Sequence, residues 1–150
     1  MSLIYRIEHP TVMMNSCMGI GPAGAYSSCI AATYSPFNEV DYIGGDNHPA
    51  PYSDGLRCFD GLIFGFLRLA DARRWFYSEG DLGRWNADGI RLAVWLSTAS
   101  HNLVIGRSQV AFERPTCAPM YLPAYAIHQF TEETITDMAA DFFPIQECPL

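Results

Sequence analysis

The sequence contains no lysine, so all nine of its basic residues are arginine, the residue type suited to bidentate ion pairs and stacking. Acidic residues outnumber basic ones by 16 to 9, which gives a formal net charge of −7 at pH 7. General affinity for nucleic acid needs a basic footprint, so this balance argues against direct nucleic-acid binding. It permits an acidic surface that binds a basic partner.

Long apolar runs and metal-ligand spacings are missing as well. No stretch approaches the length of a membrane span, and the N-terminus has no apolar core of signal-peptide length. The five cysteines show no C-x-x-C spacing, and no H-x-x-x-H occurs, so we expect no metal site. These absences predict a cytoplasmic protein with reduced thiols and no membrane contact.

The stretch 62–76 is the clearest structural signal in the chain. Residues 62–66 form an apolar run of strand length, within which Gly65 permits close approach of another backbone or a ligand. Leu69, Ala72 and Phe76 then recur at the spacing of one helix face. The stretch therefore predicts a buried strand that runs into an amphipathic helix whose Leu69 and Phe76 pack on a sheet.

Similar patterns predict a single α+β domain over residues 1–150, with a mixed or antiparallel sheet and about three helices. His9-Pro10 is expected to end the first strand, and residues 35–56 to form a long irregular loop. Residues 116–150 hold five acids and no base, and we expect an acidic segment packed on the domain. The expected strands are 3–8, 62–66, 90–96 and 103–113, and the expected helices are 69–77, 82–88 and 131–142.

Three motifs have both a chemical and a structural interpretation. Gly19 to Gly24 match G-x-G-x-x-G, but no buried strand precedes them, so a flexible glycine loop is favoured over a dinucleotide site. Cys58 and His48 could form a nucleophile pair oriented by Asp54 or Asp60, although sequence proximity is weak support. A group of arginines and tryptophans could hold a phosphate or a base, but helix-end ion pairs are favoured. This group comprises Arg73, Arg74, Trp75, Arg84, Trp85 and Arg91.

The order of elements resembles that of ADP-ribosyltransferase-like domains. The resemblance rests on Tyr5-Arg6, on Phe64-Gly65-Phe66 before an Ala-Asp-Ala-Arg helix, and on Ser108-Gln109-Val110. It implies that Arg6 contacts NAD, that Phe64 or Phe66 lies near the nicotinamide pocket, and that Gln109 occupies the position of the catalytic glutamate. A neutral Gln109 cannot stabilise a positively charged sugar centre, so such a domain could bind NAD without catalysis.

A second resemblance favours a different function. The segments 4–9, 19–22, 64–66 and 74–76 resemble small proteins of phages and prophages, many of which inhibit host defences, anti-CRISPR proteins among them. The leading hypothesis is therefore a phage protein that binds a host protein and has no cofactor, an inhibitor of a bacterial defence system. The alternative is the ADP-ribosyltransferase-like enzyme or a derived NAD-binding module.

The last predicted helix supplies the expected partner-binding residues. Ile135, Met138 and Phe142 fall at one helix face and should point inward. The helix acids should face water and meet the basic partner, unless they only aid solubility. They are Glu132, Glu133, Asp137 and Asp141.

Overall fold

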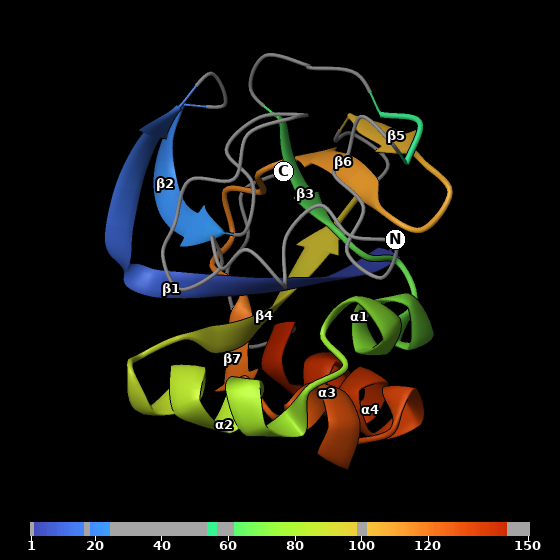
Figure 1. Ribbon diagram of the computed structural model, residues 1–150. Helices are drawn as coiled ribbons and strands as arrows, with labels where there is room; N and C mark the ends of the chain where they lie inside the picture. Colours follow the sequence, from blue (N-terminus) through green and yellow to red (C-terminus); the bar gives the residue numbers. More distant parts are fainter. Residues whose placement is uncertain (1, 17–18, 25–53, 57–61, 99–101, 144–150) are drawn as a thin grey trace.

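A computed structural model describes residues 2–16, 19–24, 54–56, 62–98 and 102–143 of the chain. The fold is α+β and contains two small antiparallel sheets (Figure 1). One sheet has the order β2-β1-β4-β7, with β1 (Ser2–Ser16), β2 (Gly19–Gly24), β4 (Arg91–Ser97) and β7 (Met120–Pro123). The other has the order β3-β6-β5, with β3 (Leu62–Gly65), β5 (Leu103–Ile105) and β6 (Val110–Glu113). The helices are α1 (Leu69–Trp75), α2 (Glu79–Ala87), α3 (Ala126–Gln129) and α4 (Glu132–Phe142).

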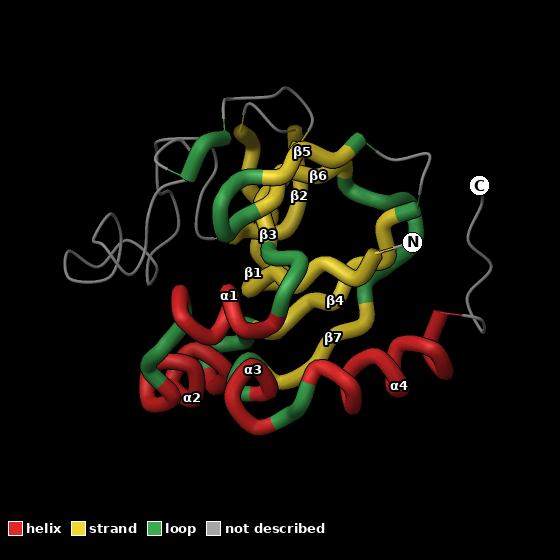
Figure 2. Tube along the Cα trace, turned by 90° about the vertical axis from the view of Figure 1, so that its right-hand side faces the viewer, coloured by secondary structure: helices red, strands yellow, loops and turns green. Residues whose placement is uncertain are grey.

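The helices gather on one side of the four-stranded sheet, as Figure 2 shows, and the three-stranded sheet lies on the other side. Residues 4–8 of β1 are therefore buried on both faces of the strand. Its Tyr5 is hydrogen-bonded to Glu132 of α4 on the helical side. Its Ile4 points to the other face, where it comes so close to Gly65 that a Cβ there would lie 2.8 Å from Ile4 Cγ2. The prediction that Gly65 permits a close approach is confirmed.

The two sheets are joined at one point of β1. The Tyr5 N–H donates to the Phe66 carbonyl, the Phe66 N–H donates to the Tyr5 carbonyl, and both distances are 2.8 Å. From Glu8 onward β1 pairs with β2 instead, beginning with Gly24. The other edge of β1 pairs with β4 from Ser2↔Ser97 to Glu8↔Arg91.

The central strand and the long helices form where the sequence predicts them. Leu69 and Phe76 are buried, with 1% and 2% of their surface exposed, which confirms the inward face of α1. Helix α2 begins at Glu79, earlier than the predicted residue 82, because the Ser78 side chain accepts a hydrogen bond from Asp81 N–H at 3.2 Å. Helix α4 is capped by Thr131, whose hydroxyl accepts a hydrogen bond from the Thr134 N–H at 3.1 Å.

Two predictions near the N-terminus are wrong. The first strand does not end at His9-Pro10 but continues to Ser16, because its pairing with β2 shifts register between His9 and Met13. A proline is tolerated at such an irregularity. Gly19 to Gly24 form β2 rather than a flexible loop, since their backbone pairs with residues 8–16.

Three other regions of the chain have expectations from the sequence: the strand 103–113, the loop 35–56 and the cysteines. The predicted strand 103–113 is a hairpin of β5 and β6, whose turn lies between Ile105 and Val110. Of the loop expected over residues 35–56, only residues 54–56 lie within the described part of the chain. Cys117 is disulfide-bonded, so the expectation of reduced thiols is wrong for this residue.

Candidate functional site

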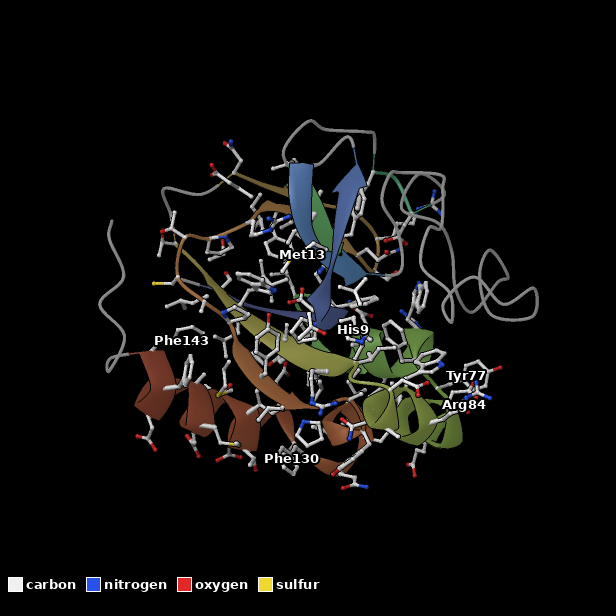
Figure 3. The ribbon with its side chains drawn as sticks, turned by 90° about the vertical axis from the view of Figure 1, so that its left-hand side faces the viewer. His9, Met13, Tyr77, Arg84, Phe130 and Phe143 are labelled. Atoms are coloured by element: carbon white, nitrogen blue, oxygen red, sulfur yellow. The ribbon has the colours of Figure 1, made fainter. Side chains whose placement is uncertain are left out.

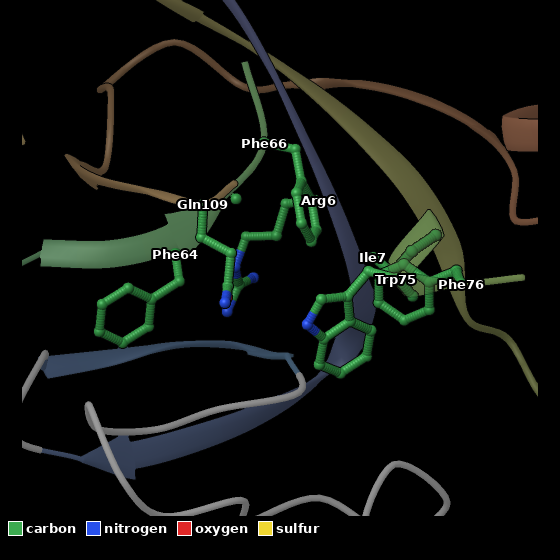
Figure 4. Close-up of a pocket in the computed structure, with 8 residues that line it drawn as sticks. Arg6, Ile7, Phe64, Phe66, Trp75, Phe76 and Gln109 are labelled. Atoms are coloured by element: carbon green, nitrogen blue, oxygen red, sulfur yellow. The ribbon is translucent and has the colours of Figure 1, made fainter. Parts of the chain in front are cut away.

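A small pocket lies where β1 changes from β3 to β2 as its neighbour (Figure 4). The cavity has a volume of about 20 Å³, which is room for about one ordered water. Aromatic rings and two polar side chains form its walls. The lining residues are Arg6, Ile7, Phe64, Gly65, Phe66, Trp75, Phe76 and Gln109.

The pocket brings together all four residues that the resemblance to ADP-ribosyltransferase-like domains selected. Arg6, Phe64, Phe66 and Gln109 are spread over more than 100 sequence positions and come from three different strand regions. In Figure 4 the nitrogen-bearing ends of Arg6 and Gln109 converge on the same space. These four residues therefore lie around one small pocket, and their role in binding NAD stays a prediction.

Arg6 is a buried ion-pair residue. Only 7% of its surface is exposed, and its guanidinium is paired with the carboxylate of Glu8, which is completely buried. Arg6 is thus a strand residue paired with Glu8 on the face of β1 that the second sheet covers. Gly24 makes room for the guanidinium, since a Cβ there would lie 2.8 Å from Arg6 Cζ. The last glycine of the G-x-G-x-x-G sequence thus admits an arginine in this structure.

Glu8 has a second partner that the sequence did not reveal. The Tyr121 hydroxyl donates to Glu8 Oε1 at 2.9 Å, although Tyr121 lies 113 positions away. Burial and the Glu8 carboxylate raise the pKa of Tyr121 well above its usual value. Arg114 lies near the same group, and burial followed by the charge of Arg6 lowers the pKa of its guanidinium. The polar wall of the pocket is therefore part of a larger buried charge network.

Gln109 is held in place through its backbone. Its N–H donates to Asp54 Oδ2 at 2.6 Å, and its carbonyl accepts from Gly106 N–H at 2.8 Å. The sequence proposed Asp54 only as an orienter for Cys58 and His48. Those two residues, and the alternative orienter Asp60, lie outside the described residues.

Aromatic side chains close the remaining side of the pocket. Phe66 contacts Trp75 and Phe76 edge-on, with ring centroids 6.4 Å and 6.2 Å apart. The ring centroids of Trp75 and Phe76 are 4.5 Å apart. Edge-on pairs of this kind add stability beyond simple burial, so this wall is a packed part of the core.

The predicted arginine and tryptophan group is mainly structural, as the sequence favoured. Arg74 and Arg68 pair with Asp71 at 2.9 Å and 3.0 Å, and Arg84 pairs with Asp81 at 3.1 Å. Arg73 and Arg91 instead donate hydrogen bonds to backbone carbonyls and to a side-chain amide. Arg73 donates to the carbonyls of Ile127 and Phe130 at the end of α3, and Arg91 donates to Asn86.

The four predicted partner-binding acids divide into two groups. Glu133, Asp137 and Asp141 are exposed and take part in no ion pair among the described residues; we call these three the α4 acidic face. In Figure 3 side chains tipped with oxygen extend from the outer side of α4, away from the sheet. Ile135 is fully buried on the opposite side, while Met138 and Phe142 are half-buried.

Glu132 has an internal role. Its Oε1 accepts a hydrogen bond from the Leu69 N–H at 3.1 Å, which connects α4 to the first turn of α1. Burial, with a smaller contribution from the Glu132 carboxylate, raises the pKa of Tyr5 to about 12. Glu132 therefore contributes to the packing of α4 and is a poor choice for testing partner binding.

The described residues hold no group of three or more metal-binding side chains, and no helix among them is long and apolar enough to cross a membrane.

Comparison with known proteins gives one match. Residues 1–121 match the family model described as the bacteriophage T4 Y00F protein. This span includes every residue of the pocket and ends before α4. No curated protein and no solved structure matches the chain.

Proposed function

Because the chain belongs to the family of the bacteriophage T4 Y00F protein, we propose that this phage protein acts by binding a host protein, as an inhibitor of a bacterial defence system. The proposed contact surface is the α4 acidic face, and the proposed partner presents a basic surface to it. The supporting observation is that these exposed acids have no basic partner within the described part of the chain.

The use of charge elsewhere in the molecule strengthens this proposal. Glu8, Asp71 and Asp81 each pair with an arginine of the same chain. Glu133, Asp137 and Asp141 recur every four residues and therefore form one row along α4. A row of like charges on a helix destabilises it slightly, and a basic partner would remove that cost.

Affinity capture with matched variants tests this proposal. The α4 variant carries Glu133→Gln, Asp137→Asn and Asp141→Asn, and retains Glu132 because of its internal role. The α2 control carries Glu79→Gln, Asp81→Asn and Asp88→Asn, so its net charge changes by the same amount. We expect the wild type and the α2 control to retain the same host protein from a bacterial lysate, and the α4 variant to lose it. Equal retention by all three would place the binding surface elsewhere.

A second candidate function is supported by the pocket. Arg6, Phe64, Phe66 and Gln109, which the resemblance to ADP-ribosyltransferase-like domains selected, line one pocket, as such a domain or a derived NAD-binding module would have them do. The space holds about one water, so a nicotinamide ring could enter only if the side chains around it moved apart. Arg6 is already paired with Glu8, and Gln109 carries no charge. These features favour binding without catalysis and rank this function second.

Calorimetry with NAD tests this second candidate. We expect the wild type to bind NAD and Gln109→Ala to bind it more weakly, because Gln109 is the polar lining residue that takes no part in an ion pair. Gln129→Ala is the matched control, since Gln129 is exposed on α3. Absence of heat from the wild type at millimolar NAD would exclude NAD binding by the isolated protein.

A further inference from the structure

The strands at the edges of the two sheets differ in how they are protected. In the described part of the chain these strands are β2 and β7 of one sheet and β3 and β5 of the other. An edge strand can pair with another chain unless proline, charge or a covering segment prevents it. Strand β2 contains Pro22 and β7 contains Pro123, while β3 leads into the backbone bonds that join Phe66 to Tyr5. Strand β5 has no proline and no charged residue, since its sequence is Leu-Val-Ile.

The hydrogen bonds of the β5–β6 hairpin show which backbone groups of β5 face outward. The Asn102 carbonyl accepts from an N–H of β6 at 3.0 Å, and the Gly106 N–H donates across the turn at 2.8 Å. Bonded and non-bonded residue pairs alternate along an antiparallel ladder, so Val104 is the residue of β5 that is bonded to β6. The N–H and C=O groups of Leu103 and Ile105 therefore point away from β6, and no described residue pairs with that edge.

The side chains of this strand are apolar and partly open to solvent. Ile105 lies directly opposite Val110, so the two side chains share one face of the sheet. Val110 is 1% exposed, whereas Ile105 is 67% exposed. Leu103 and Val104 are half-buried. The apolar face of the three-stranded sheet is thus covered at β6 and uncovered at its outer edge.

We propose that β5 pairs with the β5 strand of a second copy of this chain, antiparallel about a two-fold axis at Val104. In this register Leu103 of each copy lies opposite Ile105 of the other. Both residues have outward-facing backbone groups, so the two pairs can form about four N–H···O bonds. The contact is isologous, because each copy contributes the same residues. The paired edge is short, so the dimer forms weakly and reversibly, unlike a permanent dimer with a large interface.

The position of β5 in the molecule sets the salt dependence of this dimer. Strand β5 and helix α4 lie on opposite sides of the protein (Figures 1 and 2). The dimer therefore leaves both α4 acidic faces open and does not depend on their binding a host protein. Each copy carries a net charge of −7, which opposes association, while the paired strands are uncharged. Salt screens this repulsion, so it should strengthen the dimer, whereas it should weaken a contact between α4 and a basic protein.

Sedimentation velocity on the full chain at increasing protein concentration tests the proposal. The wild type should pass from monomer to dimer, and at a lower concentration in high salt. Ile105→Pro removes an outward N–H without touching the bond between Val104 and β6, and this variant should remain a monomer. Ile105→Thr keeps that N–H but loses apolar contact in both copies, so it should raise the dimer Kd about tenfold. Met13→Thr, which changes another exposed apolar strand residue, should dimerise like the wild type.

Several results would overturn the pairing of β5 with itself. A wild type that stays monomeric at every concentration would do so, as would a dimer that persists in Ile105→Pro. If Ile105→Pro does not fold, Ile105→Lys takes its place, because a charge also blocks an edge strand. A denaturing gel without reductant excludes a dimer linked by disulfides.

Amide hydrogen exchange locates the contact independently of these variants. In the wild type the Leu103 and Ile105 amides should exchange more slowly as the protein concentration rises, while the Val104 amide, already bonded to β6, should change little. Exchange of the Leu103 and Ile105 amides that does not depend on protein concentration would refute the proposal. Protection that appears only when a captured host protein is added would assign the edge to that protein and equally contradict self-pairing.

Discussion

At the scale of single residues, Arg6 shows how much the surroundings decide a side chain's role. The sequence places Arg6 and Glu8 on one strand face, and their pairing follows from that spacing. Their burial does not follow from it, because the covering sheet is built from residues 62–65 and 103–113, far along the chain. Tyr121, which completes the network, has no local signal at all.

The first prediction concerns this buried pair. Arg6→Ala should lower the free energy of unfolding by about 3–5 kcal/mol, because it leaves the buried Glu8 carboxylate uncompensated. Arg84→Ala, which removes an exposed pair with Asp81, should change it by at most about 1 kcal/mol. Urea denaturation of the two variants measures the difference. Similar small losses would show that the Arg6–Glu8 pair is not buried in solution.

A second prediction concerns alkaline pH. Burial and Glu132 raise the pKa of Tyr5 from 10.0 to about 12, so the folded state holds this proton more tightly than the unfolded state. The resulting stability is fully present below pH 10 and is lost as the pH rises toward 12. Thermal midpoints should therefore fall across this window, and fall less steeply in Tyr5→Phe. An equally steep fall in Tyr5→Phe would assign the effect to other groups.

At the scale of elements, the sequence predicts helices and central strands better than it predicts the edge strand β2 and the point where β1 ends. Apolar spacing and caps such as Thr131 are local, and they located α1, α2 and α4 to within a few residues. The length of β1 and the existence of β2 depend on pairing between the two segments, which tolerates Pro10 through a shift in register. Four of the residues that line the pocket were named by the resemblance. The size of the pocket depends on packing between distant segments, which the sequence does not show.

The third prediction tests the junction of α1, α2 and β3. Phe76 is 2% exposed and lies between Phe66 and Trp85, with ring centroids 6.2 Å and 6.3 Å away. Phe76→Ala should cost about 3–5 kcal/mol of folding free energy, because it leaves a cavity. The neighbouring Tyr77 is 54% exposed, and Tyr77→Ala should cost at most about 0.5 kcal/mol. Equal thermal midpoints for the two variants would remove Phe76 from the core.

At the scale of the whole molecule, the acids that pair with arginines and the acids of α4 lie in different elements. The arginines at positions 6, 68, 74 and 84 pair with acids of the same chain. The acids of the last helix lie beyond the final arginine of the sequence, Arg114. This separation is the reason why we propose the α4 acidic face as the surface that meets a basic host protein.

The most direct test of this claim is the association rate constant with the captured host protein, measured at low and at high salt. Neutralising acids that face a basic partner slows association while leaving the fold intact, and salt suppresses the difference. The α4 variant should therefore associate about tenfold more slowly than the α2 control at low salt, and at nearly the same rate at high salt. Equal association rates for the two variants at low ionic strength would contradict the claim that α4 binds the host protein.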